Sequence, residues 1–401
     1  MSGPSITRRG FMGGVAGAAA AQMVRAAAAQ SADTGAKVKA GLIGVGGRGN
    51  MIAQLVEAHG GYELTAVADY FPKVAEEAGR QFNVPEKNRF SGLTGYQRLL
   101  ESGVEAVFLE TPPYCFPDHV EAAVAAGIHV YMAKPVACDV PGCLRVAEAA
   151  KRAKDAGRCF LIDFQTRTDP FFMEGVDRVH RGEIGPLGLV SSLYTDESFS
   201  DPPLTDTVES RLQHLIWVND DGLGGGYLVN AGIHAVDVAL WLAGGVPVSA
   251  VGASRIARSD PHGDSHDVYS VTYEFADGLI VNHRGEHLRN KFDFHCDCVA
   301  HGRDGYLECG YSNSVALHGK QDWPGGKVED LYLVGARRNI ASFHTAIVSK
   351  DASNPTVEPS IHANLAVMLG REACLRGSRV TWDEMIKESR RIEPDLRGLK
   401  A

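Results

Sequence analysis

A glycine-rich loop near the start of the chain has the spacing of a phosphate-binding turn. Gly44, Gly46 and Gly49 form a G-x-G-x-x-G pattern between an apolar run of strand length and a segment with helical spacing of apolar residues. The first glycine allows a tight turn, the second lets backbone amides approach a pyrophosphate, and the third lets the helix pack closely on the strand. The helix N-terminus adds partial positive charge for the phosphates. The pattern therefore predicts a dinucleotide site.

An acid lies where the ribose of such a dinucleotide is held. Asp69 ends the next strand-like segment, twenty residues after Gly49. Its carboxylate can accept hydrogen bonds from both ribose hydroxyls and would repel a 2′-phosphate, so we expect NAD as the cofactor and NADP as the less favoured one. The residues expected at the cofactor are Gly44, Gly46, Gly47, Arg48, Gly49, Asp69, Thr111, Pro112, Pro113, Lys134 and Pro135.

Two residues far apart in the sequence have types suited to oxidising an alcohol. A histidine such as His234 can accept the alcohol proton as hydride leaves carbon, and a cation such as Lys134 can stabilise the developing alkoxide. Helical phases place Asn230, His234 and Asp237 on one stripe, beside an apolar stripe that would face the core. We therefore expect Lys134, His234 and Asn230 to be catalytic residues that meet in a cleft.

The alternation of strands and helices indicates how these residues are positioned. From residue 37 to 165 strand and helix patterns alternate, which is typical of a parallel sheet with right-handed crossovers. The fold class is therefore α/β, with an N-terminal Rossmann dinucleotide-binding domain over residues 37–165. Thr111-Pro112-Pro113 follows a buried strand pattern, so a rigid loop lies at the edge of the sheet where ligands bind.

The second half, residues 166–401, has a different pattern. Consecutive strands with few helices between them predict an α+β substrate-binding domain with an open, mainly antiparallel sheet. Two helical stretches within Ser342–Ile386 are expected to pack back on both domains. The strands expected here are Leu187–Tyr194, Val248–Arg255, Asp267–Phe275, Gly278–Glu286, Phe292–Ala300 and Gly305–Cys309.

Bulk properties limit the class of partner. The 401 residues are too many for one ordinary core, in agreement with two domains. A formal charge of -9 and a pI near 5.9 argue against nucleic acid or an anionic membrane surface. The eight cysteines show no paired CxxC zinc pattern. We expect a small-molecule substrate and, because an open sheet leaves one face uncovered, a homo-oligomer.

The N-terminus has the order of an export signal. Arg8-Arg9 precedes an Ala/Gly-rich apolar stretch, and small residues follow at Ala27-Ala28-Ala29. We expect residues 1–29 to be a twin-arginine signal peptide, residues 30–36 to be a linker, and the mature protein to be periplasmic or otherwise exported. No later run is expected to span a membrane.

With these motifs in place, the chain resembles the Gfo/Idh/MocA family, named for glucose-fructose oxidoreductase and inositol dehydrogenase. The resemblance implies hydride transfer between a sugar or glycoside hydroxyl and NAD, with a Glu-Lys-Pro lysine beside the nicotinamide and an Asp-x-x-x-His pair at the sugar hydroxyl. Glucose-fructose oxidoreductase is itself exported by the twin-arginine route. The likeness rests on residues 44–49, Thr111-Pro112-Pro113, residues 127–135 ending in Ala133-Lys134-Pro135, and residues 224–237.

Two departures from the family pattern affect the chemistry. Ala133 stands where the motif usually has glutamate, and Asn230 where it usually has aspartate. Asn230 can orient the His234 ring but cannot stabilise an imidazolium by charge, so His234 should be a weaker base than in typical members. Two alternatives therefore stay open: a glycosidase or lyase that oxidises its substrate transiently and regenerates NAD, and a non-catalytic NAD-bound sugar sensor.

A sugar site needs aromatic faces and many hydrogen-bonding groups. The residues expected to contact substrate are Gln165, Arg167, Tyr194, Trp217, Asp237 and His234, with further candidates in His214, Asp220, His283, Arg284, Glu286 and His287. His283, Glu286 and His287 lie in a strand pattern, where alternate residues face opposite sides, so we expect no metal site.

Overall fold

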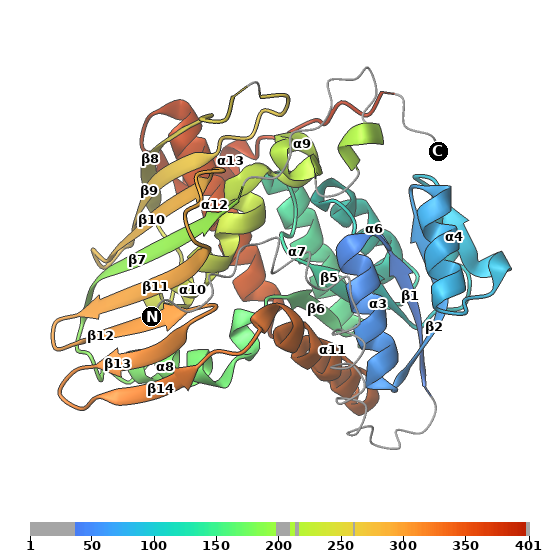
Figure 1. Ribbon diagram of the computed structural model, residues 1–401, viewed down its shortest axis with the longest axis horizontal. Helices are drawn as coiled ribbons and strands as arrows, with labels where there is room; N and C mark the ends of the chain where they lie inside the picture. The colour runs from blue at the N-terminus through green and yellow to red at the C-terminus, as the bar shows by residue number, and fades with distance from the viewer. Residues whose placement is uncertain (1–36, 198–208, 213–215, 260, 398–401) are drawn as a thin grey trace.

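The computed structural model describes residues 37–197, 209–212, 216–259 and 261–397. The expected signal peptide, the linker and the candidate His214 lie outside these residues. Two sheets stand side by side with helices between them (Figure 1). The structure confirms the fold class predicted from the sequence. A Rossmann domain with a parallel sheet is followed by a domain with a mainly antiparallel sheet.

The first sheet is parallel and has the strand order β3-β2-β1-β4-β5-β6, which is that of a dinucleotide-binding fold. Its central strands are buried along their whole length, as expected where helices cover both faces. The strands are β1 (Val38–Ile43), β2 (Tyr62–Asp69), β3 (Arg89–Ser91), β4 (Ala106–Leu109), β5 (His129–Ala133) and β6 (Phe160–Asp163).

Helices from both ends of the chain cover this sheet. Their bounds are α3 (Gly47–His59), α4 (Pro72–Gln81), α5 (Gly95–Leu100), α6 (Phe116–Ala125), α7 (Val140–Asp155) and, from the C-terminal part, α11 (Leu331–Ser349). Helix α11 packs against α3 and β6. Its apolar residues complete the hydrophobic core on the α3 face of the sheet, although α11 is far from α3 in the sequence. Short 3₁₀ turns, η2 (Glu86–Asn88), η3 (Pro113–Cys115) and η4 (Thr166–Thr168), connect the elements.

The second sheet has nine strands among the described residues, in the order β14-β13-β12-β11-β7-β10-β9-β8-β15. Neighbours are antiparallel except β10 and β7, which are parallel. The strands are β7 (Leu187–Asp196), β8 (Ser249–Arg255), β9 (Val268–Glu274), β10 (Ile280–His287), β11 (His295–Gly302), β12 (Tyr306–Gly310), β13 (Ser314–His318), β14 (Trp323–Lys327) and β15 (Val380–Thr381).

One face of this sheet is covered by helices that also contact the first domain (Figure 1). Helix α12 contacts α7 of the first domain and β8 of the second, and every residue from Ala363 to Cys374 is buried, as expected for a helix packed on several sides. The elements of this half are α8 (Pro170–His180), η5 (Glu209–Leu212), η6 (Ile216–Asn219), α9 (Asp221–Gly224), a π-helical turn η7 (Leu228–Gly232), α10 (Ile233–Ala243), α12 (Val357–Arg376) and α13 (Trp382–Glu388).

One strand beyond those expected and one helix boundary are explained by local chemistry. Strand β14 contains Pro324 and two glycines, and it lies at the sheet edge, where proline is tolerated. Helix α11 begins at Leu331 instead of near Ser342, because Asp330 caps it by accepting a hydrogen bond from the Leu333 amide. Gly335 inside this helix is needed for packing, since a Cβ there would lie 2.5 Å from Cβ of Gln165.

One helical run corrects the expectation about membrane spans. Asp221–Ala243 is long and apolar enough to cross a membrane, but 83% of its most apolar window is buried inside the protein, as for a core helix. The search covered the described residues only. This run carries Asn230 and His234, so its apolar character reflects the core around the candidate site.

Candidate functional site

A cavity of about 810 Å³ lies at the C-terminal ends of β1, β2, β4 and β5, where ligands of such sheets bind. Residues of both domains line it. The expected residues found in its lining are Gly44, Gly46, Gly47, Arg48, Gly49, Asp69, Thr111, Pro112, Pro113, Lys134, Gln165, Tyr194, Trp217, Asn230 and His234. Pro135, Arg167 and Asp237 are outside the lining.

The glycine loop has the backbone that its spacing requires. Gly44 adopts φ +86°, which favours glycine, and a Cβ on Gly49 would lie 1.8 Å from the Gly44 carbonyl oxygen. Gly46 and Gly47, in contrast, have no atom within 4 Å of a Cβ position, so this side of the loop is open to the cavity. Gly46 caps helix α3 without any side-chain hydrogen bond, which leaves the helix N-terminus available to an anion. The loop therefore fits the pyrophosphate of NAD.

Asp69 lies at the end of β2 and is fixed by two backbone amides. Its Oδ2 accepts a hydrogen bond from the Val45 amide and its Oδ1 one from the Phe71 amide, both at 3.0 Å. Burial raises the pKa of this carboxyl and the two amides lower it. Each carboxylate oxygen retains a further lone pair for a ribose hydroxyl. The structure thus holds the acid in a fixed orientation beside the loop.

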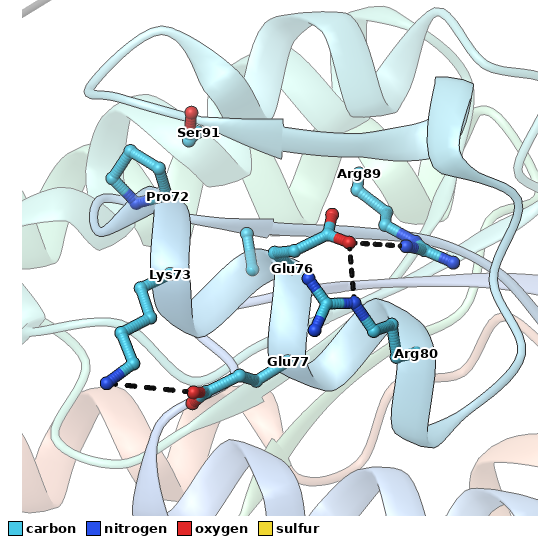
Figure 2. A pocket seen from close by; sticks show the side chains of 8 residues that line it. Pro72, Lys73, Glu76, Glu77, Arg80, Arg89 and Ser91 are labelled. Atoms are coloured by element: carbon cyan, nitrogen blue, oxygen red, sulfur yellow. Dashed lines mark hydrogen bonds and ion pairs between the residues drawn. The ribbon is translucent and has the colours of Figure 1, made fainter.

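A second, shallower hollow adjoins this end of the cavity (Figure 2). The hollow contains two guanidinium groups that could in principle hold a 2′-phosphate, but both are paired with Glu76. Arg89 donates to Glu76 at 2.8 Å and Arg80 at 2.9 Å, while Lys73 lies 3.8 Å from Glu77 (Figure 2). With these charges paired, the carboxylate of Asp69 sets the local preference against a 2′-phosphate.

Replacing Asp69 with alanine is therefore expected to remove much of the preference for NAD over NADP. Alanine lacks the carboxylate, so it can neither accept hydrogen bonds from the ribose hydroxyls nor repel a 2′-phosphate. Titration of apoprotein with both nucleotides measures the effect. Asp69→Asn is the matched control, because it keeps the side-chain shape and should lose the charge effect alone. Tighter binding of NADP than NAD by the wild-type protein would contradict the assignment.

Lys134 directly follows β5, and its peptide bond to Pro135 is cis. The Lys134 ammonium donates a hydrogen bond of 2.6 Å to the backbone carbonyl oxygen of Asn230. That carbonyl belongs to the π-helical turn, a local widening of the helix that is frequent at functional sites. A lysine of the nucleotide domain and a helix of the second domain therefore meet within one cavity.

His234 lies in the first turn of α10, half-buried among aromatic rings. Its ring is nearly parallel to that of Tyr194, with centroids 6.3 Å apart, and meets Tyr311 and Phe164 edge-on at 6.0 and 6.2 Å. Tyr194 and Tyr311 also line the cavity. Packing from several sides restricts the ring, which is what a positioned general base requires.

Two expected substrate residues are placed differently. Arg167 and Asp237 form a bidentate ion pair, with Nη2–Oδ1 and Nε–Oδ2 distances of 2.8 and 3.0 Å, and neither lines the cavity. Asp237 is fully buried, and the Arg167 guanidinium lies 5.0 Å from the ring centroid of Trp241. In α10 Asp237 follows His234 by three residues, a step that turns its side chain about 60° away from the His234 direction, and Asp237 faces Arg167 instead of the cavity. The pair joins η4 to α10.

Asp237→Ala is accordingly expected to cost about 3–5 kcal/mol in the free energy of unfolding, because it leaves Arg167 largely buried without its partner. Unfolding in urea measures this cost. The double variant Arg167→Met/Asp237→Leu should recover much of the loss, since it removes both charges. NAD affinity should be unchanged in the folded fraction. A folded Asp237→Ala protein with wild-type stability and a raised KM would restore the substrate role.

The remaining polar candidates serve the structure. Asp220 caps α9, accepting from the Gly222 and Leu223 amides. His283 is buried on the inner face of β10, and burial lowers its pKa to about 3, while His287 stacks on Tyr227 with centroids 4.6 Å apart. Arg284 and Glu286 face the other side of that strand. Among the described residues no group of three His, Cys, Asp or Glu side chains could hold a metal ion.

Sequence reasoning missed several residues of the cavity. Glu110 directly follows β4 and lines the cavity, whereas Asp163, the last residue of β6, is not in the lining. Both carboxylates are paired with Arg48. His119 lies 3.4 Å from the Thr111 hydroxyl, and burial lowers its pKa to about 4, so it is neutral near pH 7. Further lining residues missed are Asp196, Phe294, Tyr311 and Tyr332. The sequence signal that could have identified Glu110 and Asp163 is an acidic residue directly at the C-terminal end of a buried strand.

Comparison with known proteins agrees with this geometry. Residues 38–159 match the family model described as the oxidoreductase family with an NAD-binding Rossmann fold, and residues 174–308 match the GFO/IDH/MocA C-terminal domain. The chain belongs to the Gfo/Idh/MocA oxidoreductase family. Family membership confirms an oxidoreductase with an NAD-binding domain.

Relatives of this Gfo/Idh/MocA protein extend over most of the chain. Inositol 2-dehydrogenase of Rhizobium meliloti (strain 1021) is 24% identical over 346 residues, covering 84% of this chain and 96% of the relative. A solved inositol dehydrogenase homolog from Azotobacter vinelandii, complexed with NAD+, has a TM-score of 0.73 at 16% identity, covering 88% and 99% of the two chains. Levoglucosan dehydrogenase, in complex with NADH and levoglucosan, has a TM-score of 0.70 at 18% identity, covering 86% and 99%. At these identities the structural likeness shows the shared fold.

Proposed function

We propose that this protein is an NAD-dependent dehydrogenase that transfers hydride between NAD and a hydroxyl of a sugar, glycoside or cyclic polyol. The observation that carries the proposal is the 2.6 Å hydrogen bond from the Lys134 ammonium to the Asn230 carbonyl. It joins the nucleotide domain to the helix that carries His234, inside the cavity that also contains the glycine loop and Asp69. The inositol and levoglucosan dehydrogenases among its relatives support the substrate class.

The chain's own residues supply binding, proton transfer and charge stabilisation. NAD, when bound, supplies the acceptor for the hydride. His234 takes the proton of the substrate hydroxyl, and the positive charge of Lys134 stabilises the oxygen as the C–H bond breaks. The Asn230 carbonyl holds the Lys134 ammonium in place, so this residue acts through its backbone even though its side chain lacks a carboxylate.

The substrate end of the cavity favours a ring with one apolar face and several hydroxyls. Aromatic side chains provide flat apolar surface, and Gln165 and Asp196 provide hydrogen-bonding groups. Gln165 Oε1 is buried and has no hydrogen-bond partner among the described residues, so it is available to a hydroxyl donor. The aromatic rings in the lining include those of Tyr194, Trp217, Phe294, Tyr311 and Tyr332.

A panel of pyranosides, glycosides and inositols tests the proposal. Accumulation of NADH with one of them supports net oxidation. Bond cleavage without NADH accumulation would replace it with the glycosidase or lyase function, and thermal stabilisation by a sugar without turnover would replace it with a sensor.

We further propose export by the twin-arginine route, supported by Arg8-Arg9 and the small residues at Ala27-Ala28-Ala29. Changing both arginines to lysine keeps the charge and should leave the protein in the cytoplasm on cell fractionation. Unchanged export would point to another route.

A homo-oligomer through the second sheet is proposed from its outer face. Ile280 and Tyr306 are exposed large side chains, at 41% and 37%, and strand register places them in one row across β10, β7, β11 and β12. Such an apolar row is typical of a protein interface. Ile280→Lys/Tyr306→Lys should reduce the molar mass in solution; an unchanged mass would exclude this face.

A further inference from the structure

Three strand ends bring two acids to either side of one alanine at the base of the cavity. Leu109 of β4 pairs with Met132 of β5, so the next residues, Glu110 and Ala133, leave the sheet side by side. Ala133 pairs in turn with Asp163 of β6. Glu110 and Ala133 both line the cavity next to Lys134.

Arg48 of the glycine loop connects the two acids. Its Nε lies 3.0 Å from Oε2 of Glu110, and its Nη2 is paired with Oδ2 of Asp163. The side chains of Glu110 and Asp163 have no exposed surface. The register of β4, β5 and β6 places Ala133 between the two acids, where its side chain is only a methyl group.

The two acids are held differently. Asp163 also accepts hydrogen bonds from the Gln165 amide at 3.0 Å and from the Asn339 amide of α11 at 2.6 Å, so its position is fixed from three sides. Glu110 Oε1, in contrast, is buried and has no hydrogen-bond partner among the described residues. The position of Glu110 therefore depends on its pairing with Arg48.

We propose that Glu110 is a positioning residue of the active site. Its negative charge, on the strand next to Ala133, orients Arg48 of the glycine loop and supports the positive charge of Lys134. This inference rests on the proposed dehydrogenase function for its activity readout, and on the charge cluster alone for its stability readout.

The charges facing Glu110 come from every neighbouring element. They are Arg48 of α3, Asp163 of β6 and Lys134 after β5, with the Tyr131 and Tyr332 hydroxyls close to Arg48. Burial raises the pKa of Glu110 to about 7, with Asp163 adding to the rise and Arg48 and Lys134 opposing it. Since the pKa of Glu110 in the folded protein is higher than the ordinary value of 4.5, ionisation of Glu110 lowers stability as the pH rises through about 7.

Glu110→Gln keeps the size of the side chain and removes its negative charge, so it tests whether Glu110 acts through its charge or only through packing. This variant should become more stable relative to wild type as the pH rises from about 5 to about 8, because it lacks the ionisation that costs stability. Yet it should transfer hydride roughly tenfold or more slowly at the upper pH and lose the rise in rate near neutral pH. Loss of activity with an unchanged pH profile, or wild-type activity with an unchanged profile, overturns the proposal.

Relocating the carboxylate gives the decisive test. In the wild-type background Ala133→Glu should lower both the melting temperature and the rate, because it adds a third acid between two others. In the Glu110→Ala background the same change should restore part of the lost rate, since Arg48 regains a carboxylate partner, whereas Ala133→Gln should not. There it should also lower the melting temperature by less than in wild type, because only Asp163 remains as a neighbouring acid. A lower rate in both backgrounds, or an equal fall in melting temperature in both, contradicts the proposal. The melting-temperature comparison needs no substrate, so it stands even if no member of the sugar panel reduces NAD.

Discussion

Single-turnover reduction of bound NAD is expected to slow on the order of a hundredfold or more when His234 is replaced with alanine. The His234 imidazole lines the cavity and is fixed by Tyr194, Tyr311 and Phe164, and its removal leaves the substrate hydroxyl without a general base. NAD affinity should change little, because the glycine loop and Asp69 lie in the other domain. Rapid mixing of NAD-loaded enzyme with substrate separates this chemical step from product release.

Lys134→Ala is the companion variant and should be comparably slow, through loss of positive charge at the reacting oxygen. Lys134→Arg keeps the charge but cannot reproduce the single 2.6 Å contact with the Asn230 carbonyl, so an intermediate rate is expected. If His234→Ala reduces NAD at the wild-type rate with the true substrate, the catalytic assignment is wrong and the sensor alternative gains support.

A large effect on both stability and NAD binding is expected from Gly49→Ala. A Cβ at this position would lie 1.8 Å from the Gly44 carbonyl oxygen, a backbone atom that cannot rotate away. The loop and helix α3 must then separate, at a cost of about 3 kcal/mol or more in the free energy of unfolding. NAD binding should be lost with the loop geometry. Calorimetry of the apoprotein and NAD titration measure the two consequences.

Gly46→Ala is the matched control for that variant. Its Cβ position has no atom within 4 Å, so the apoprotein should keep its melting temperature while the methyl group obstructs the pyrophosphate. Equal stability losses in the two variants would show that the loop is not built as described.

The features that follow from local backbone requirements could be predicted from the sequence. The spacing of Gly44, Gly46 and Gly49 and the acid at Asp69 are local signals, and each has a backbone or hydrogen-bond counterpart in the structure. The place of Lys134 at the ligand cavity could likewise be predicted, since it follows a buried strand and ligands bind at the C-terminal ends of parallel strands.

Features that depend on strand register or on a partner far away in the sequence could not be predicted in this way. Asp237 was expected on the stripe of His234, but it is paired in the core with Arg167, which comes from a different element. The neighbourhood of Glu110, Ala133 and Asp163 depends on which strands pair and in which register. From the sequence alone, Ala133 therefore did not reveal that two acidic side chains lie beside it.

The most direct test of the account is the fate of the substrate hydrogen. Wild-type enzyme is loaded with NAD and mixed with a cyclic polyol or pyranoside that carries deuterium on the carbinol carbon, and the nucleotide is then analysed by mass spectrometry. If hydride passes from the substrate carbon to NAD, the NADH formed should contain deuterium, and the label should appear much more slowly in His234→Ala. Conversion of the substrate with no deuterium passing through the nucleotide at any time would contradict hydride transfer to NAD in this cavity.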